Sequence, residues 1–212
     1  TKTGDSDSDP NLSIKGTELK DLTKMPELGS ANLKVVTKMT QFFIWSEEVR
    51  GKISQMFPNH LMGEKFWSYV LKEATAYHKK WCFSSPNEKI SWEFAIKFPT
   101  NFAAIEAKLY PMIKATANQS TRDTLSDRTS ENTVSNTSIG VLFLTMLDIF
   151  ECTGDQKAEI LKALTEPTMP NNAAETSDII RQWNKLRLGI SLWEISPPDS
   201  SILASVLMKL VK

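Results

Sequence analysis

Large apolar side chains recur every three or four residues over three stretches of the first half of the chain. These stretches cover residues 33–57, 61–83 and 103–117. Such spacing places the apolar side chains on one face of an α-helix. Each stretch therefore predicts an amphipathic helix. Pro58 should end the first, and Pro111 should kink or split the third.

A different pattern separates the second and third predicted helices. Trp92, Phe94, Ile96 and Phe98 alternate with polar residues, which is the period of a half-buried strand. No other segment offers a partner strand, so we favour a helix or an extended loop here.

The second half of the chain contains clear helix start and stop signals. An apolar run at 139–150 precedes Thr153 and Gln156, which fit a capping box for a helix that stops before Pro167. A further helix should surround Trp183. Ser196 as N-cap, followed by proline at the first helical position, predicts the start of the last helix.

Together these elements predict an all-α protein with two small helical subdomains. Residues 1–30 are polar and broken by Gly and Pro, and we expect a flexible lead-in. The N-terminal subdomain should cover 31–118 and the C-terminal one 137–212. Residues 119–136 are dense in Ser, Thr, Asn and Asp and predict a polar linker, with a short helix at 122–128 as an alternative.

The composition is that of a globular protein with no net electrostatic field. Lys+Arg and Asp+Glu balance at 25 each, so nothing draws the whole molecule to nucleic acid or to an anionic membrane. Two cysteines, Cys82 and Cys152, are too few for a disulfide framework and suggest a reducing compartment. The longest apolar run is too short to cross a bilayer, and no secretory signal is visible. We expect a cytoplasmic protein without membrane contact, and, because the chain opens at Thr1 and stops within an apolar helical pattern, a segment of a longer one.

His78 and Cys82 are the strongest candidates for chemistry, because residues four apart share a helix face. A zinc site needs four ligands, however, and His60 and Cys152 are the only other histidine and cysteine. The chain also lacks a nucleophile elbow and a phosphate-binding loop. We therefore predict no metal, no cofactor and no enzymatic activity.

Two further groups are candidate contact sites. Lys79 and Lys80 lie between aromatic residues and are a candidate weak nucleic-acid contact, although a solvated helix end explains them better. The apolar stripe from Trp183 to Trp193 is open to two interpretations, core and interface. The candidate self-association residues are Trp183, Leu186, Trp193, Ile202 and Leu203.

An ordered set of short motifs in the C-terminal part resembles a known family. The set is Gly154, Leu161 with Leu164, Glu166-Pro167, Arg181-Gln182-Trp183, and Pro198-Asp199 followed by Ser201-Ile202-Leu203. This succession resembles the capsid region of Gag-like proteins of copia-type LTR retrotransposons, over roughly residues 125–211.

The resemblance implies a capsid-like fold and a structural function. Such a protomer would self-assemble into particles that package the element's RNA, with RNA contacts outside this segment. A different class of function remains open, in which a cellular helical adaptor binds a partner helix or peptide in an apolar groove.

Overall fold

The computed structural model describes residues 22, 24–25, 34–90, 98–130, 136–151, 153–193 and 195–211. These residues form helices and no strand, which confirms the all-α prediction. Most of the predicted lead-in, the alternating residues 92–96 and Cys152 lie outside the described residues. In chain order the elements are α1 (Val35–Gln55), α2 (His60–Phe83), α3 (Pro86–Ile90), α4 (Thr100–Thr116), α5 (Gln119–Ser130), α6 (Ser138–Ile149), α7 (Gly154–Thr165), α8 (Ala173–Gly189), the 3-10 helix η2 (Ile190–Trp193) and α9 (Ser200–Val211).

Helices α1 and α2 form a tightly packed hairpin. The side chain of Asn59 accepts a hydrogen bond from the Leu61 amide and caps α2. Gly63 lies against the end of α1, where an added Cβ would come within 2.7 Å of the Ile53 carbonyl oxygen and the Ser54 Cα. Because both are backbone atoms, only glycine permits this approach.

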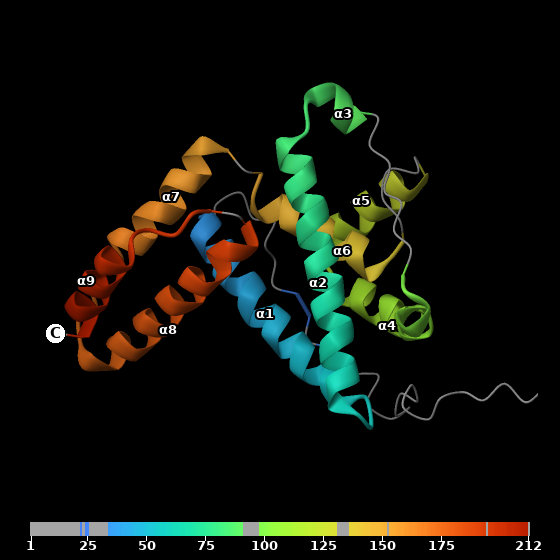
Figure 1. Ribbon diagram of the computed structural model, residues 1–212, viewed down its shortest axis with the longest axis horizontal. Helices are drawn as coiled ribbons and strands as arrows, with labels where there is room; N and C mark the ends of the chain where they lie inside the picture. The colour runs from blue at the N-terminus through green and yellow to red at the C-terminus, as the bar shows by residue number, and fades with distance from the viewer. Residues whose placement is uncertain are drawn as a thin grey trace, which may run out of the picture.

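Helix α6 lies at the centre of one end of the molecule, packed against α1, α2, α4 and α5 (Figure 1). Thr137 caps its N-terminus by accepting from the Gly140 amide. Glu106 of α4 accepts hydrogen bonds from the Ser138 amide (2.7 Å) and the Ser138 hydroxyl (2.8 Å), and so fastens α4 to the start of α6.

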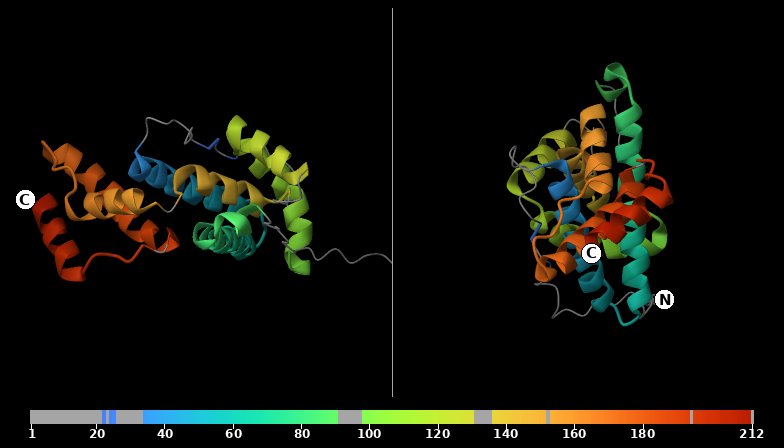
Figure 2. Two further views of the ribbon diagram at one scale, coloured as in Figure 1. Left: turned by 90° about the horizontal axis from the view of Figure 1, so that it is seen from above. Right: turned by 90° about the vertical axis from the view of Figure 1, so that its left-hand side faces the viewer.

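Helices α7, α8 and α9 pack together at the other end of the molecule (Figures 1 and 2). Helix α1 joins the two ends, because it packs against α2 and α6 and also against α7 and α8. The buried apolar side chains form one continuous cluster. The predicted division into two subdomains joined by a linker is therefore not confirmed. Helix α6, which the sequence grouped with the helices that follow, packs mainly against helices that precede it.

Three local predictions need correction. Most of the predicted polar linker is helix α5, so the alternative of a short helix at 122–128 is the correct one, and α5 buries Leu125 against the core. Helix α4 continues past Pro111, so of the two predicted effects of this proline the split is wrong. The last helix begins at Ser200, so Ser196 is not its cap; the Asp199 carboxylate accepts from the Ser201 amide instead (2.8 Å). Pro198 explains the difference, because a residue that precedes proline avoids the helical conformation.

The capping box at the start of α7 is confirmed. The Thr153 hydroxyl accepts from the Gln156 amide, and the Gln156 side chain accepts from the Thr153 amide. Within the described part of the chain, no helix combines the length and the apolar character needed to cross a membrane.

Candidate functional site

Helix α9 carries apolar side chains on two opposite faces, of which only one is covered. Val206 and Leu210 are buried against α7 and α8. On the other side, Leu207, Met208 and Val211 are 39%, 62% and 65% exposed. Ala204 is exposed as well, and together the four follow the i, i+3, i+4, i+7 spacing of a helix-packing seam. We call Ala204, Leu207, Met208 and Val211 the α9 stripe.

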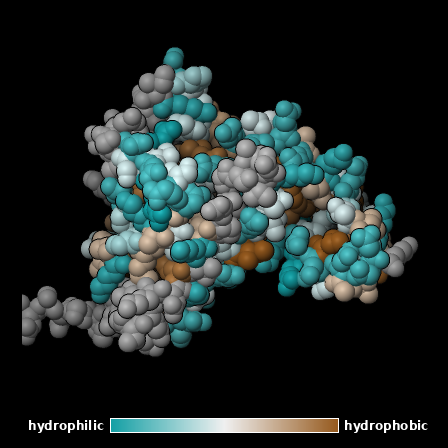
Figure 3. All heavy atoms as spheres, turned by 180° about the vertical axis from the view of Figure 1, so that it is seen from behind, coloured by the Kyte–Doolittle hydropathy of each residue, from teal (hydrophilic) through white to brown (hydrophobic). Residues whose placement is uncertain are grey.

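Few charges oppose the burial of this surface. Lys209 is the one charged residue between Ser200 and Val211. It is exposed and, at 100° per residue, lies on the side of α9 away from the stripe. Viewed from behind, apolar side chains reach the surface at the end of the molecule formed by α7, α8 and α9 (Figure 3). Because charged groups are depleted at the centres of protein interfaces, this composition suits a contact surface.

The five residues chosen from sequence divide into two groups. Trp183, Leu186 and Trp193 are 6%, 3% and 4% exposed, so they contribute mainly to the core of the protomer. The Trp183 indole also donates to the Leu164 carbonyl oxygen (2.9 Å), which ties α8 to α7.

The other two residues lie on α9. Ile202 is 46% exposed and Leu203 is half-buried. Sequence analysis missed the α9 stripe itself. Its signal is visible in the sequence, because α9 has apolar residues on more faces than one neighbour can cover.

A groove of about 710 Å³ lies between α1, α7 and α8. Its wall combines apolar side chains, among them Ile44, Ile179 and Trp183, with charged ones of both signs. Two buried acceptors face no donor, namely the Oε1 atoms of Gln41 and Glu159, and both residues line the groove. The groove therefore offers hydrogen-bond acceptors beside an apolar floor, which suits a peptide or helix that brings a donor.

The His78 and Cys82 pair is structural. The His78 Nε2–H donates to the Phe150 carbonyl oxygen (2.7 Å), and the ring packs edge-on against Trp193 at 5.0 Å. Burial lowers the pKa of His78, and the hydrogen bond to Phe150 opposes part of that effect.

Cys82 differs from the expectation of reduced thiols. Its Sγ lies 3.7 Å from the His78 Nε2, but Cys82 is disulfide-bonded and has no thiol to ionise. Among the described residues, no three His, Cys, Asp or Glu side chains gather as a metal site would require.

Lys79 and Lys80 are exposed in the last turns of α2, and other cations gather nearby. The Lys157 ammonium lies 5.8 Å from the ring of Phe83, which is 70% exposed. Sequence analysis assigned no wider basic surface to this region. The sequence nevertheless contains a signal of such a surface, because lysines recur at intervals of seven residues along α2.

Comparisons with protein-family models, with curated proteins and with solved structures find no match, so function has to be inferred from these surfaces.

Proposed function

We propose that this chain is a structural protomer that self-associates, a Gag-like capsid protein of a retrotransposon whose particles package the element's RNA. The observation that carries the proposal is the α9 stripe, an apolar helix face left uncovered in the protomer. The order of C-terminal motifs from Gly154 to Leu203 supports the choice of family. Self-association would occur through contact between the α9 stripes of two copies.

The α9 stripe suits a second copy of itself. If two α9 helices pack antiparallel, Leu207 of one copy faces Met208 of the other, and Ala204 faces Val211. The same pairs form twice, as two-fold symmetry requires. Ala204 is small, so the two helix axes can approach as closely at the ends of the contact, where Ala204 faces Val211, as at its centre.

Charge also favours this arrangement over a parallel one. An antiparallel pair aligns the two helix dipoles favourably, whereas a parallel pair aligns them unfavourably. In both arrangements Lys209 lies on the side of α9 away from the stripe. A two-fold contact joins protomers only in pairs. Particle growth needs a further head-to-tail contact, and weak contacts of both kinds then add through multivalency.

The proposal is tested by replacing Leu207 and Met208 with serine. Light scattering and electron microscopy across a concentration series should show particles for the wild type and dispersed protomers for the double variant. Met169→Ser is the matched control, because Met169 is 50% exposed and lies outside α9. Wild-type protein that stays monomeric at high concentration in physiological salt, or a double variant that still assembles, contradicts the proposal.

Assembly in the cytoplasm is part of the same proposal. The disulfide at Cys82 makes this location testable, because the cytosol keeps most protein thiols reduced. In a cytosolic protein the Cys82 disulfide of the structure should be reduced, so alkylation of freshly lysed cells followed by mass spectrometry should find Cys82 as a thiol. Cys82 that is oxidised in intact cells argues for an oxidising compartment.

The groove between α1, α7 and α8 favours a second candidate, an adaptor that binds a partner helix or peptide. The unpartnered oxygens of Gln41 and Glu159 support it. Ile44 is 36% exposed at this groove, and Ile44→Asp should abolish capture of one stoichiometric partner without changing self-association. Finding only contacts between copies of the chain removes the basis of this candidate.

A further inference from the structure

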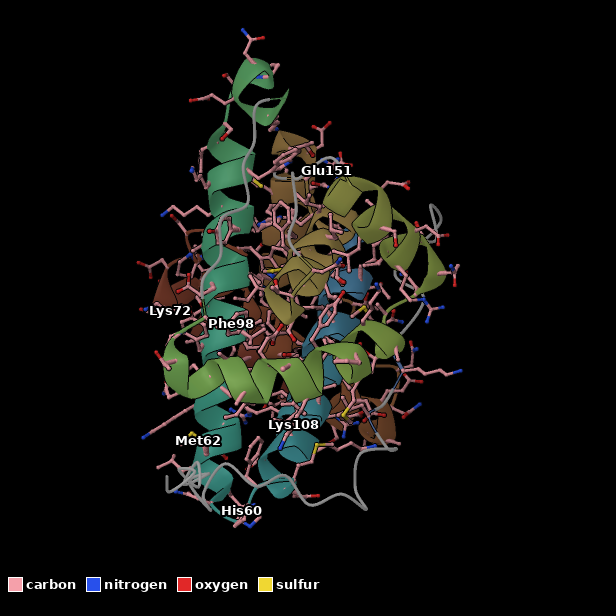
Figure 4. The ribbon with its side chains drawn as sticks, turned by 90° about the vertical axis from the view of Figure 1, so that its right-hand side faces the viewer. His60, Met62, Lys72, Phe98, Lys108 and Glu151 are labelled. Carbon is pink, nitrogen blue, oxygen red and sulfur yellow. The ribbon has the colours of Figure 1, made fainter. Side chains whose placement is uncertain are left out.

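A row of lysines runs along the exposed side of α2. Lys65, Lys72 and Lys79 are seven residues apart and all exposed. Seven residues make almost two full helical turns, so successive side chains of the row differ in direction by only about 20° and follow each other at intervals of about 10 Å. Figure 4 shows Lys72 on the outer side of α2, opposite α6. We call Lys65, Lys72 and Lys79 the α2 lysine row.

The acidic residues of α2 point elsewhere. Glu64 and Glu73 each adjoin a lysine of the row in sequence, and therefore lie about 100° away around the helix. Glu73 is close enough to Tyr69 and Tyr77 to add to the rise in their pKa, of which burial is the larger cause. Within α2, the side that carries the lysine row contains no carboxylate.

The row ends at an exposed aromatic ring. Phe83 is four residues beyond Lys79 on the same side of α2, and the Lys157 ammonium of α7 lies over its ring. On the other side of α2, the ring of Trp81 has Lys89 of α3 and Arg128 of α5 each at 5.4 Å.

Cations from four helices therefore surround the C-terminal end of α2. Negative features oppose them, among them the carboxylate of Glu88, which faces Lys80 and accepts from the Ser85 amide, and the partial charge of the helix C-terminus.

We propose that the α2 lysine row and Phe83 form a binding site for single-stranded RNA, in which the lysines contact the phosphate backbone and a base stacks on Phe83. The site depends on the proposed packaging function and places its RNA contact within this segment. A linear series of cations beside an open aromatic ring is how proteins hold single strands without reading sequence. Because the total charge is balanced, attraction of RNA has to come from a local basic surface such as this one.

Salt dependence separates this site from non-specific attraction. Each phosphate that a cation neutralises on a single strand adds about −0.7 to the slope of log K against log salt. Changing Lys65, Lys72 and Lys79 to glutamine should therefore reduce the magnitude of the slope by about 2. Glutamine has nearly the helix propensity of lysine, so α2 should stay folded. Circular dichroism checks this point.

The experiment is fluorescence anisotropy with a labelled 20-nucleotide polyuridine RNA over a series of KCl concentrations. It uses protein that carries the two serine substitutions in α9, so that binding is measured on dispersed protomers. The control variant changes three exposed lysines elsewhere, Lys34, Lys108 and Lys162, to glutamine and has the same net charge. This control should keep both the affinity and the slope of the parent protein.

The contribution of Phe83 can be measured separately from that of the lysines. Phe83→Ala should weaken binding at least about fivefold with an unchanged salt slope, because it removes stacking and no charge. Phe83→Tyr keeps the ring and should retain the affinity.

Three results overturn the proposal. They are equal losses in the two lysine variants, no effect of Phe83→Ala, and binding to vesicles of anionic lipid without binding to the RNA. If particles form but the α2 lysine row does not affect RNA binding, the site is wrong and the capsid function stands. If RNA binds as expected but no particles form, the capsid function is wrong and the site stands.

Discussion

Helices α6 and α9 are equally long and strongly apolar, yet the structure treats them differently. Ten of the twelve residues of α6 are buried, against two of twelve in α9. Helix α6 is surrounded by α1, α2, α4 and α5, whereas the main described neighbours of α9 are α7 and α8, on one side. Apolar content thus makes a helix core only when neighbours cover every face. Where neighbours cover one face, the other remains available for another molecule.

From this comparison we expect the largest loss of stability when a buried residue of α6 is substituted. Phe143 is 1% exposed, and its ring packs edge-on against Trp81 at 6.0 Å. Phe143→Ala should lower the free energy of unfolding by about 3–5 kcal/mol, because it leaves a cavity in a close-packed core. Urea denaturation measures the change. A loss below about 1 kcal/mol would mean that α6 is less enclosed than the structure shows.

We expect a smaller loss of stability when the hydrogen bonds between Glu106 of α4 and Ser138 at the start of α6 are removed. Glu106→Ala leaves the buried Ser138 amide without its acceptor and should lower the free energy of unfolding by about 1–3 kcal/mol. Thermal or urea unfolding measures this change. Glu106→Gln keeps an oxygen for the amide and a donor for the hydroxyl, and serves as the control.

The same pair predicts how stability depends on pH. Burial raises the pKa of Glu106 above its usual 4.5, and the hydrogen bonds from Ser138 oppose part of the rise. The folded protein therefore favours the protonated carboxyl. The contribution of Glu106 to stability is present below pH 4.5 and is lost as the pH rises through the raised pKa. Unfolding curves of the wild type and of Glu106→Gln should diverge over that interval, and parallel curves would contradict the shift.

Removing the cap at the start of α9 should lower the free energy of unfolding by about 1 kcal/mol. Asp199→Ala removes the side chain that accepts from the Ser201 amide and should destabilise the protein by that amount. Ser196→Ala is the control and should change stability by less than about 0.5 kcal/mol, since Ser196 lies outside the helix. Equal effects of the two substitutions would place the cap further upstream.

The smallest effect on stability is expected in the α9 stripe. Met208→Ser should change the free energy of unfolding of the protomer by less than about 0.5 kcal/mol, because the side chain is 62% exposed. Self-association should weaken in the same sample when it is followed by sedimentation velocity. A large loss of stability with intact self-association would show that Met208 belongs to the core, like its counterparts in α6.

Much of the local structure could be predicted from sequence. The spans of α1 and α2 and the capping box of Thr153 and Gln156 depend on residues three or four apart, which a sequence displays directly. The polar composition of α5 favoured a linker, with a short helix at 122–128 only as the alternative. Its one large buried residue, Leu125, gains its partners from α6, and such distant contacts are not visible in local periodicity.

The candidate sites were harder to predict for the same reason. Trp183 and Ile202 look alike in sequence as apolar residues on helices, but one is buried and the other exposed. The α2 lysine row, by contrast, depends only on the helical period and could have been found. Its association with Lys157 could not, because α7 meets the end of α2 only in the folded chain.

The sequence alone determined that the chain is helical and where most helices begin and end, because spacing, caps and proline act over a few residues. Only the tertiary structure decided that α6 is enclosed while α9 keeps an uncovered apolar face. It also decided that Cys82 and His78 are structural and that the Lys157 ammonium of α7 lies over the ring of Phe83. Burial and proximity depend on which distant surfaces meet, and that is a property of the whole chain.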